Sequence, residues 1–528
     1  MSEAAAVPAR RGVSPWVVAP VVALAAFMEV LDISIANVAL DHIAGSLSVS
    51  IDTSTWVLTS YTVTNAIVVP ISGWLSSVVG RKRFFLTSIA GFSVASLLCG
   101  LAPSLGLLVL FRAIQGIAGG GLQPASQAIL ADAFPPAKRG TAFALYGLAV
   151  VFAPAIGPTL GGWITDSATW RWVFLINVPV GIVVFVLVEM LVSDPAYLVK
   201  QRLARLRQGI RLDWIGFSLL TLGLGGMQIV LDRGQQDDWF SSTFILLLTV
   251  AFVAGLVAFV VWELYDKDPI VDLRLLGGRN FGIANLQMFA LGLVLLASTA
   301  LLPIFVQSRL GYTALDAGLV LTPGGIALVF IMPVMGRLVT RVDAKWLIAI
   351  GFVISGLSLL MMGGFTTQTD YWTIVWVRAF QAAGLAFLFI PINTAAYLGL
   401  PQEKSSNASA IINMSRNVGG SIGISLTTAF LTRRGQLHQS ELAQNASRFN
   451  DNYREAIERL GHVFARLPGE AANAAQHAAA VVYQNVLAQA NMLAFIDDFR
   501  ALALLSFVLI PLAFLLKKTT GAAAHAGH

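Results

Sequence analysis

Two carboxylates, Glu29 and Asp32, lie three residues apart inside an apolar run over residues 16–38. This spacing places both side chains on one face of a helix. An ionised group in hydrocarbon costs about 2.5–3.5 kcal/mol, so such a residue normally faces a wet cavity or a partner. Desolvation and mutual repulsion raise the affinity of two such carboxyl groups for a proton, and the pair can titrate as a coupled unit. We therefore expect Asp32 to carry a proton, and Glu29 either to share that role or to hydrogen-bond a neighbouring helix.

Three arginines, Arg112, Arg378 and Arg416, also lie within apolar runs. A guanidinium group stays charged in proteins, so each of the three needs acceptors inside the fold. The candidate partners of Arg112 are Asp32, Glu29 or free backbone carbonyls. We expect Arg112 to tune the proton affinity of Asp32, and a purely structural role stays open for each arginine.

The other polar side chains of interest in these runs are amides, namely Gln115, Asn285, Gln287, Gln381, Asn393 and Asn413. Together with Arg378 and Arg416, they are candidates for lining a substrate cavity. The alternative is that they form hydrogen bonds that hold neighbouring helices together.

Proline and glycine cluster at Pro154, Gly157, Pro158, Gly161 and Gly162. Proline removes a backbone donor and bends a helix, and glycines four residues apart let a second helix approach closely. The segment therefore predicts a bent helix and a tight helix–helix seam near the outer face.

The elements that hold these residues must cross a membrane, because 56% of the 528 residues are hydrophobic and only 12% are charged. That is too little polar surface to coat a soluble fold. Apolar runs of about 18 to 25 residues, enough to cross about 30 Å of hydrocarbon, predict fourteen transmembrane helices, the last two over 407–431 and 498–516. The predicted fold class is an all-α membrane protein.

The placement of Lys and Arg indicates the orientation, because loops rich in these residues stay in the cytoplasm. One set of connections holds Arg10, Arg11 and most of the other basic residues. The short loops of the opposite side hold only Arg171, Arg233 and Arg309. This imbalance predicts that both termini are cytoplasmic, and it explains the basic charge without a nucleic-acid partner.

The chain also contains an internal repeat. Arg112-Ala-Ile-Gln115 recurs about 265 residues later as Arg378-Ala-Phe-Gln381. Repeated six-helix halves with a site between them are a transporter arrangement. The predicted units are a six-helix bundle over 1–192, a basic linker over 193–213, two additional helices over 214–264, helices nine to thirteen over 265–432, a long polar periplasmic loop over 433–497, and the last helix with a cytoplasmic tail over 498–528.

Two of these units leave alternatives open. The linker over 193–213 is basic and amphipathic, so it either lies along anionic lipid headgroups or is a solvated connector. The loop over 433–497 is either a lid over the outer vestibule or a docking surface for a partner.

The sequence also speaks against several classes of site. The single Cys99 excludes an intramolecular disulfide, no histidine falls within a predicted span, and no Gly-x-x-x-x-Gly-Lys-Ser/Thr phosphate loop occurs. We therefore expect no metal, no cofactor and no enzymatic activity. The energy for transport would come from the proton-motive force.

Several motifs together resemble those of the fourteen-helix drug:proton antiporters of the major facilitator superfamily, the EmrB/QacA type, over nearly the whole chain. The stretch 31–40 resembles the motif of the first helix, and Arg112-x-x-Gln115-Gly116 resembles that of helix four. The sequence Gly157-Pro158-x-x-Gly161-Gly162 resembles the antiporter signature. The stretch that contains Gly73, Gly80, Arg81 and Lys82 resembles the cytoplasmic gating loop of the superfamily.

The chain departs from these motifs at two positions. Ser77 stands where the loop motif usually has aspartate, so a charge pair is either missing or replaced. Asp41 stands where the motif of the first helix usually ends in proline.

The resemblance implies two bundles plus two additional central helices in a bacterial inner membrane. It implies export of hydrophobic or amphipathic compounds, exchanged for protons by alternating access between the bundles. The alternative is export of a specific endogenous metabolite, such as a siderophore or a lipid-like compound, by the same antiport. The loop over 433–497 resembles that of Gram-negative EmrB-like pumps, which work with a periplasmic adaptor and an outer-membrane channel.

Overall fold

The computed structural model describes residues 14–208, 213–447, 449–466 and 473–518, and every regular element in these ranges is helical. Arg10 and Arg11, which contribute to the predicted orientation, lie outside the described residues, as do 209–212 of the linker and 467–472 of the long loop.

The first bundle contains six long helical units. They are α1 (Pro15–Val38), α4 (Trp56–Val79), α5 (Arg81–Gly100), α6 (Leu105–Gly119) continued by α7 (Leu122–Ala133), α8 (Pro136–Ser167) and α10 (Asn177–Leu191). Short helices lie between them, namely α2 (Leu40–Leu47), α3 (Ile51–Ser54) and α9 (Trp172–Leu175). Helix α8 stays continuous through Pro154 and Pro158.

Two further spans follow the linker helix α11 (Ala196–Gln208). The first consists of α12 (Trp214–Leu220), one π-helical turn η1 (Thr221–Gly225) and α13 (Gly226–Arg233). The second is α14 (Thr243–Tyr265), which a short 3₁₀ turn η2 (Trp239–Ser241) precedes. Asp213 caps α12 by accepting a hydrogen bond from the backbone N–H of Gly216, which is the usual role of an N-terminal aspartate.

The second bundle begins after the 3₁₀ turn η3 (Leu273–Gly277). Its helices are α15 (Arg279–Leu310), α16 (Ala314–Leu338), α17 (Ala344–Met362), α18 (Tyr371–Ala396), α19 (Ser405–Asn445), α20 (Asp451–Ala465), α21 (Ala474–Val508) and α22 (Ile510–Phe514), with the turn η4 (Gln402–Lys404) before α19. Thr313 and Asp316 form a capping box at the start of α16, and Gly311 ends α15 with a positive φ of 73°.

Twelve of the described helices are long and apolar enough to cross a membrane, from Pro15–Val38 to Tyr371–Ala396. The last two predicted spans fall on α19 and on α21 with α22, which pack against α15 and α17 inside the second bundle. Asp497, Asp498 and Arg500 make this part of α21 more polar. The predicted number of fourteen is compatible with this arrangement and stays a prediction.

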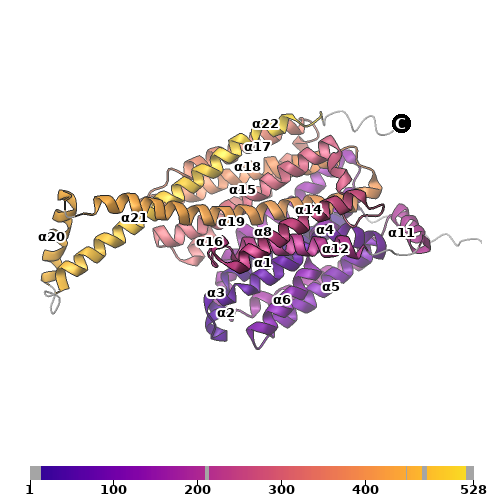
Figure 1. The fold of residues 1–528 in the computed structure, drawn as a ribbon. Helices are drawn as coiled ribbons and strands as arrows, with labels where there is room; N and C mark the ends of the chain where they lie inside the picture. Colours follow the sequence, from indigo (N-terminus) through magenta and orange to yellow (C-terminus); the bar gives the residue numbers. More distant parts are fainter. Residues whose placement is uncertain (1–13, 209–212, 448, 467–472, 519–528) are drawn as a thin grey trace, which may run out of the picture.

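The two bundles meet mainly along two helix pairs, α8 with α16 and α4 with α19. Glycines make the first contact close, because a Cβ on Gly140 would lie 2.3 Å from Val339 and a Cβ on Gly318 would lie 2.7 Å from Thr159. A Cβ on Gly73 of α4 would lie 2.9 Å from the Cα of Asn407 on α19. Figure 1 shows these helices running side by side through the body of the molecule.

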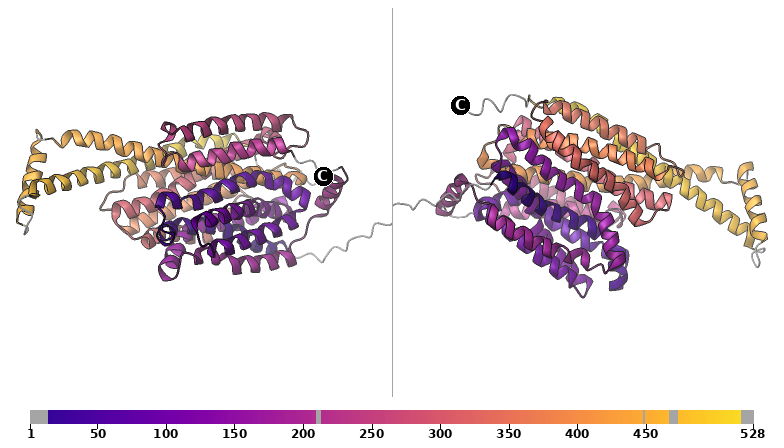
Figure 2. Two further views of the ribbon diagram at one scale, coloured as in Figure 1. Left: turned by 60° about the horizontal axis from the view of Figure 1, so that its bottom comes forward. Right: turned by 180° about the vertical axis from the view of Figure 1, so that it is seen from behind.

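Helices α19 and α21 continue beyond the bundle as a hairpin that α20 closes at its tip (Figures 1 and 2). The hairpin extends away from the body and does not fold back over the ends of the helices (Figure 2). Of the two alternatives for the segment 433–497, this geometry favours the docking surface over the lid. Helix α11 lies at the opposite end of the bundles.

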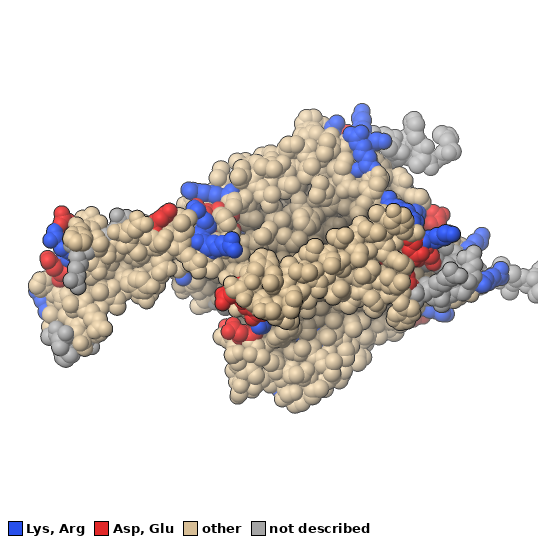
Figure 3. All heavy atoms as spheres, in the orientation of Figure 1, with Lys and Arg blue, Asp and Glu red and all other residues tan. Residues whose placement is uncertain are grey.

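Charged side chains gather at the two ends of the bundles and on the hairpin, and a broad band without charged side chains separates the ends on the face shown in Figure 3. Helix α14 lies on the outside of this face and is largely exposed, as its exposed Leu247, Val250 and Val257 show. This is the surface expected of a protein whose helices contact lipid.

Candidate functional site

Asp32 lies in the middle of the first bundle and is fully buried. Its Oδ2 accepts a hydrogen bond from Arg112 Nη1 of α6 at 2.6 Å, and its Oδ1 accepts from Gln115 Nε2 at 3.1 Å and from Asn177 Nδ2 of α10 at 2.7 Å. Hydrogen bonds from charged or amide donors stabilise a carboxylate and fix its orientation. Of the three candidate partners of Arg112, the structure therefore brings Asp32 into contact with it.

Arg112 has no exposed surface and makes its remaining contacts within the same bundle. Its Nε donates to the backbone oxygen of Val57 at 3.1 Å, and its Nη1 also donates to Gln115 Oε1 at 2.8 Å. The guanidinium carbon lies 4.3 Å from the ring centre of Tyr61 and 5.4 Å from that of Phe174. Aromatic faces stabilise a cation that has been removed from water.

Glu29, one turn earlier on α1, is also buried but has different neighbours. Its Oε1 accepts a hydrogen bond from Asn65 Nδ2 of α4 at 3.0 Å. Gln123 of α7 and Arg416 of α19 are among the groups that interact with this carboxyl group. Glu29 therefore connects the Asp32 cluster with the boundary between the bundles.

A network of polar side chains crosses that boundary. Arg416 Nη2 donates to Gln123 Oε1, and Gln127 Nε2 donates to Asn393 Oδ1. Asn413 Nδ2 donates to Gln127 Oε1 at 2.7 Å, and Tyr146 Oη donates to Asn413 Oδ1 at 3.3 Å. Of the predicted cavity residues, the structure thus brings Arg416, Asn393 and Asn413 to the interface. We call these three, with Gln123, Gln127 and Tyr146, the interface network.

Among the described residues, the other predicted cavity residues form their side-chain hydrogen bonds within their own bundle. Gln115 belongs to the Asp32 cluster, and Arg378 donates to Gln381 and, at 2.8 Å, to Thr299 Oγ1. Asn285 donates to the backbone oxygen of Phe281, and Gln287 donates to that of Leu512. These contacts favour the alternative in which the amides hold neighbouring helices together.

The predicted gating loop lies where α4, α5, α7 and α19 meet. Gly80 has a φ of 97°, a conformation that favours glycine, and it turns the chain between α4 and α5. Arg81 is buried and forms an ion pair with Asp132 of α7. Its Nη2 also donates to Ser405 and Ser406 of the second bundle at 3.0 and 2.8 Å. Arg81 therefore ties the two bundles together at this end.

Two further features of the loop are notable. Lys82 donates its backbone N–H to Asp194 Oδ1 at 2.8 Å, which attaches the loop to the start of the linker. Ser77, which replaces the usual aspartate, donates to the backbone oxygen of Trp74 at 2.8 Å. The carboxylate partner of the loop arginine in this chain comes from Asp132.

The glycines of the predicted antiporter motif bring α8 against α1. A Cβ on Gly157 would lie 2.2 Å from Ser34 Oγ, and a Cβ on Gly161 would lie 3.2 Å from the backbone oxygen of Ile35. A Cβ on Gly162 would have no atom within 4 Å. The close seam is confirmed for Gly157 and Gly161, which lie toward the C-terminal end of α8, and Pro158 lies between them.

Several residues of these clusters were not predicted from the sequence. Asn65, Asn177 and Asp132 are polar residues in or beside apolar runs, and the rule that such residues need partners could have found them. Gln123 and Gln127 have partners in the other bundle. Nothing in the local sequence around these two residues indicates those partners.

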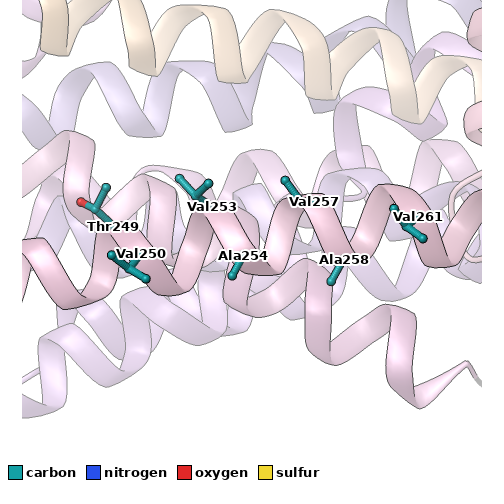
Figure 4. A pocket seen from close by; sticks show the side chains of 7 residues that line it. All are labelled: Thr249, Val250, Val253, Ala254, Val257, Ala258 and Val261. Atoms are coloured by element: carbon teal, nitrogen blue, oxygen red, sulfur yellow. The ribbon is translucent and has the colours of Figure 1, made fainter.

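A groove of about 680 Å³ lies elsewhere, along the outer face of α14 (Figure 4). All its lining residues belong to this one helix, namely Thr249, Val250, Val253, Ala254, Val257, Ala258 and Val261. No acid, base or amide lines it, so it has the character of a lipid-facing surface. The described residues contain no group of three or more His, Cys, Asp or Glu side chains that could hold a metal ion.

The geometry described above can be compared with known proteins. The family model of the Major Facilitator Superfamily matches residues 22–424. The multidrug export protein EmrB of Escherichia coli (strain K12) is 40% identical over 430 residues, which are 81% of this chain and 82% of that protein. The fatty acid resistance protein FarB of Neisseria gonorrhoeae is 35% identical over 494 residues, 94% of each chain.

Solved structures agree with this at the level of the fold. The proton:xylose symporter XylE of the same superfamily superposes with a TM-score of 0.58 at 14% identity, over 97% of this chain and 98% of that one. The human organic anion transporter MFSD10 has a TM-score of 0.56 at 14% identity, over 94% and 99%.

Proposed function

This chain belongs to the major facilitator superfamily and to the group of its members that includes EmrB, and we propose that it exports hydrophobic or amphipathic compounds in exchange for protons. The proposal rests chiefly on one observation, the fully buried pair of Asp32 and Arg112 inside a membrane bundle. A buried charge pair of this kind marks a functional site by default in a membrane protein.

The proposed role of Asp32 follows from its three donors. In the ionised form it accepts hydrogen bonds from Arg112, Gln115 and Asn177, which belong to two other helices. A proton on Asp32 would remove the charge that attracts Arg112 and would loosen α1 from α6 and α10. Proton uptake would thus alter the packing of the first bundle, which is the kind of two-state element that alternating access needs.

Glu29 and the interface network extend this effect toward the substrate. Glu29 is one helical turn from Asp32 and interacts with Gln123 and Arg416, which face each other across the boundary. A substrate with a cationic or hydrogen-bonding group would compete for these side chains when the bundles part. We propose that Glu29 and the interface network form the polar part of the substrate site.

The energy supply is sufficient for export. A membrane potential of about 100 mV contributes about 2.3 kcal/mol per charge that crosses. One proton exchanged for an uncharged substrate therefore supports moderate accumulation outside, which suits the removal of toxic compounds.

A second candidate is export of a defined lipid-like metabolite by the same exchange. The specific observation in its favour is the similarity to FarB, whose name refers to fatty acids, over nearly the full length of both chains. Competition between a fatty acid and a cationic dye in one transport assay would separate the two candidates.

We place the protein in a bacterial inner membrane with both termini in the cytoplasm. The hairpin of α19, α20 and α21 would then project into the periplasm, where it would contact an adaptor that leads to an outer-membrane channel. Support comes from its extension away from the body (Figure 2) and from exposed apolar residues such as Val463 and Tyr483 on it.

The test uses purified protein in liposomes that contain a pH-sensitive dye. Addition of substrate should drive proton movement with the wild type, and Asp32→Asn should abolish it. A matched control is Glu263→Gln, which changes a buried carboxyl group of α14 that is remote from the interface network, and it should retain the flux. Unchanged proton movement in Asp32→Asn would refute the proposed role of Asp32.

A further inference from the structure

The linker helix α11 is attached to both bundles at the end where Arg81 closes the interface. Tyr197 Oη donates to Asp132 Oδ2 at 2.5 Å and lies 3.1 Å from the backbone oxygen of Gln402, which belongs to the second half. Arg202 Nε donates to the backbone oxygen of Val78 at 3.1 Å. One hydroxyl group thus contacts the carboxylate that pairs with Arg81 and also the opposite bundle.

On the other side of α11, apolar residues are about half-exposed in the part of the chain that the structure describes. Val199, Leu203 and Leu206 are 44%, 51% and 44% exposed, and their spacing of four and three residues places them on one stripe. Lys200 and Arg207 are exposed along the edge of this stripe. Leu198, by contrast, is only 6% exposed because it faces the body.

This pattern matches the chemistry of one kind of partner. A helix with a half-exposed apolar stripe and adjacent basic residues lies in the surface of a bilayer, and its affinity increases with the anionic lipid content. Helix α11 lies beyond one end of the transmembrane helices, at the end of the bundles opposite the hairpin (Figures 1 and 2). Figure 3 shows further Lys and Arg side chains at the same end of the molecule.

We propose that α11 binds anionic phospholipids of the cytoplasmic leaflet through Val199, Leu203, Leu206, Lys200 and Arg207, and that this binding stabilises the cytoplasmically closed state through Tyr197. The bilayer surface holds the exposed side of the helix. The attached side then keeps the Tyr197 hydroxyl group between Asp132 and Gln402.

Two local features support the coupling. Burial raises the pKa of Tyr197 to about 12, so its hydroxyl group stays protonated and remains a donor to Asp132 at physiological pH. A cavity of about 460 Å³ lies beside Arg81 and Asp132 and is also lined by residues 190–195, which include the end of α10 and the start of the linker.

The docking step is tested with a polarity-sensitive probe on Leu203→Cys in the full-length protein. The natural Cys99 is buried, so labelling is selective at the surface. In nanodiscs that contain about 30% phosphatidylglycerol, the probe should enter an apolar environment, and in phosphatidylcholine alone it should stay largely in water. Lys200→Gln with Arg207→Gln should abolish the difference, whereas Lys267→Gln with Lys518→Gln, which removes two other exposed charges, should retain it.

The coupling step is tested by the distance between spin labels on Arg83→Cys and Arg341→Cys, one on each bundle. The population with the longer distance should increase about threefold without anionic lipid, and it should increase to the same extent in Tyr197→Phe whatever the lipid. The proposal would be overturned if the probe entered the bilayer equally in both lipids, or if the distances between the spin labels did not change with the lipid charge. Neither measurement uses transport, so a failure here is distinguishable from a failure of the proposed exchange of drug for protons.

Discussion

At the scale of single residues, Asp32 and Arg112 depend on each other because both charges are buried inside the first bundle. Both side chains are fully buried, and the guanidinium group of Arg112 lies over the ring of Tyr61. Removal of one partner from a buried ion pair leaves the other charge without compensation, at a cost of about 3–5 kcal/mol.

Arg112→Gln should therefore destabilise the protein much more than Arg378→Gln. Arg378 occupies the equivalent position in the second bundle, but its partners Gln381 and Thr299 carry no charge. The expected losses are about 3–5 kcal/mol for Arg112→Gln and about 1 kcal/mol for Arg378→Gln. Thermal unfolding of both variants in the same detergent measures the difference, and equal losses would contradict it.

The sequence predicts the residues of the Asp32 cluster better than those of the interface. A charge in a membrane helix must find a partner in its own bundle, so the spacing of Glu29 and Asp32 and the position of Arg112 were enough to predict a contact. The partners of Gln127 and Asn413 depend on how two bundles dock, and no local pattern encodes that. For the same reason, Gln287 and Asn285 were candidates for the cavity although their contacts lie within one bundle.

At the scale of elements, the seam between α1 and α8 depends on Gly157 more than on its neighbour Gly162. A Cβ on Gly157 would meet Ser34, whereas a Cβ on Gly162 would meet no atom within 4 Å. Overpacking of a close contact costs about 1–3 kcal/mol.

Gly157→Ala should lower the unfolding temperature and slow transport, and Gly162→Ala should leave both near the wild-type values. The pair is well matched because both changes add one methyl group to the same helix. Unfolding and drug efflux are measured side by side. A larger effect at Gly162 would show that the seam does not limit function.

The base of the hairpin contains a second cluster, where Asp497 of α21 contacts two residues of α19. Arg434 Nε lies 2.6 Å and His438 Nε2 lies 2.7 Å from Asp497 Oδ2. Partial burial raises the pKa of Asp497, but the hydrogen bonds and positive charges of His438 and Arg434 outweigh it and hold the pKa below its ordinary value. Such a group contributes stability above its ordinary pKa and loses it as the pH falls through the lowered value.

The hairpin base should accordingly stay protected from hydrogen exchange between pH 7 and pH 5 and lose protection only below about pH 4. Asp497→Asn should be less protected at all of these pH values. Glu441→Gln, which changes an exposed carboxylate near His438, is the control and should behave like the wild type. Loss of protection in the wild type near pH 6 would contradict the assignment to Asp497.

At the scale of the whole molecule, the described structure is closed at the end that carries Arg81. Close glycine contacts join α4 to α19 and α8 to α16, and Arg81 bonds to Ser405 and Ser406 of the opposite bundle. The sequence repeat predicted two bundles, and both the family match and the solved structures confirm this fold. The repeat could not predict which end is closed, because the repeated motifs are the same whichever end of the molecule is closed.

Arg81→Gln should shift the molecule toward the state that is open to the cytoplasm. A cysteine at Ser409, which is buried and donates to the backbone oxygen of Pro124 across the interface at 2.8 Å, reports the shift in a Cys99→Ala background. Alkylation from the cytoplasmic side should become several-fold faster. Arg83→Gln, an exposed neighbour on the same loop, should leave the rate unchanged, and equal rates in both variants would count against Arg81 as a closing contact.

The unbroken course of α19 gives this molecule a lever arm. The helix has 41 residues, so at about 1.5 Å per residue it measures roughly 60 Å from Ser405 at the bundle interface to Asn445 just before α20. Any tilt of the second bundle during the cycle is magnified at the far tip. A partner protein bound at the tip would be displaced in each transport cycle. A rigid attachment of that partner would in turn change the rate of the cycle.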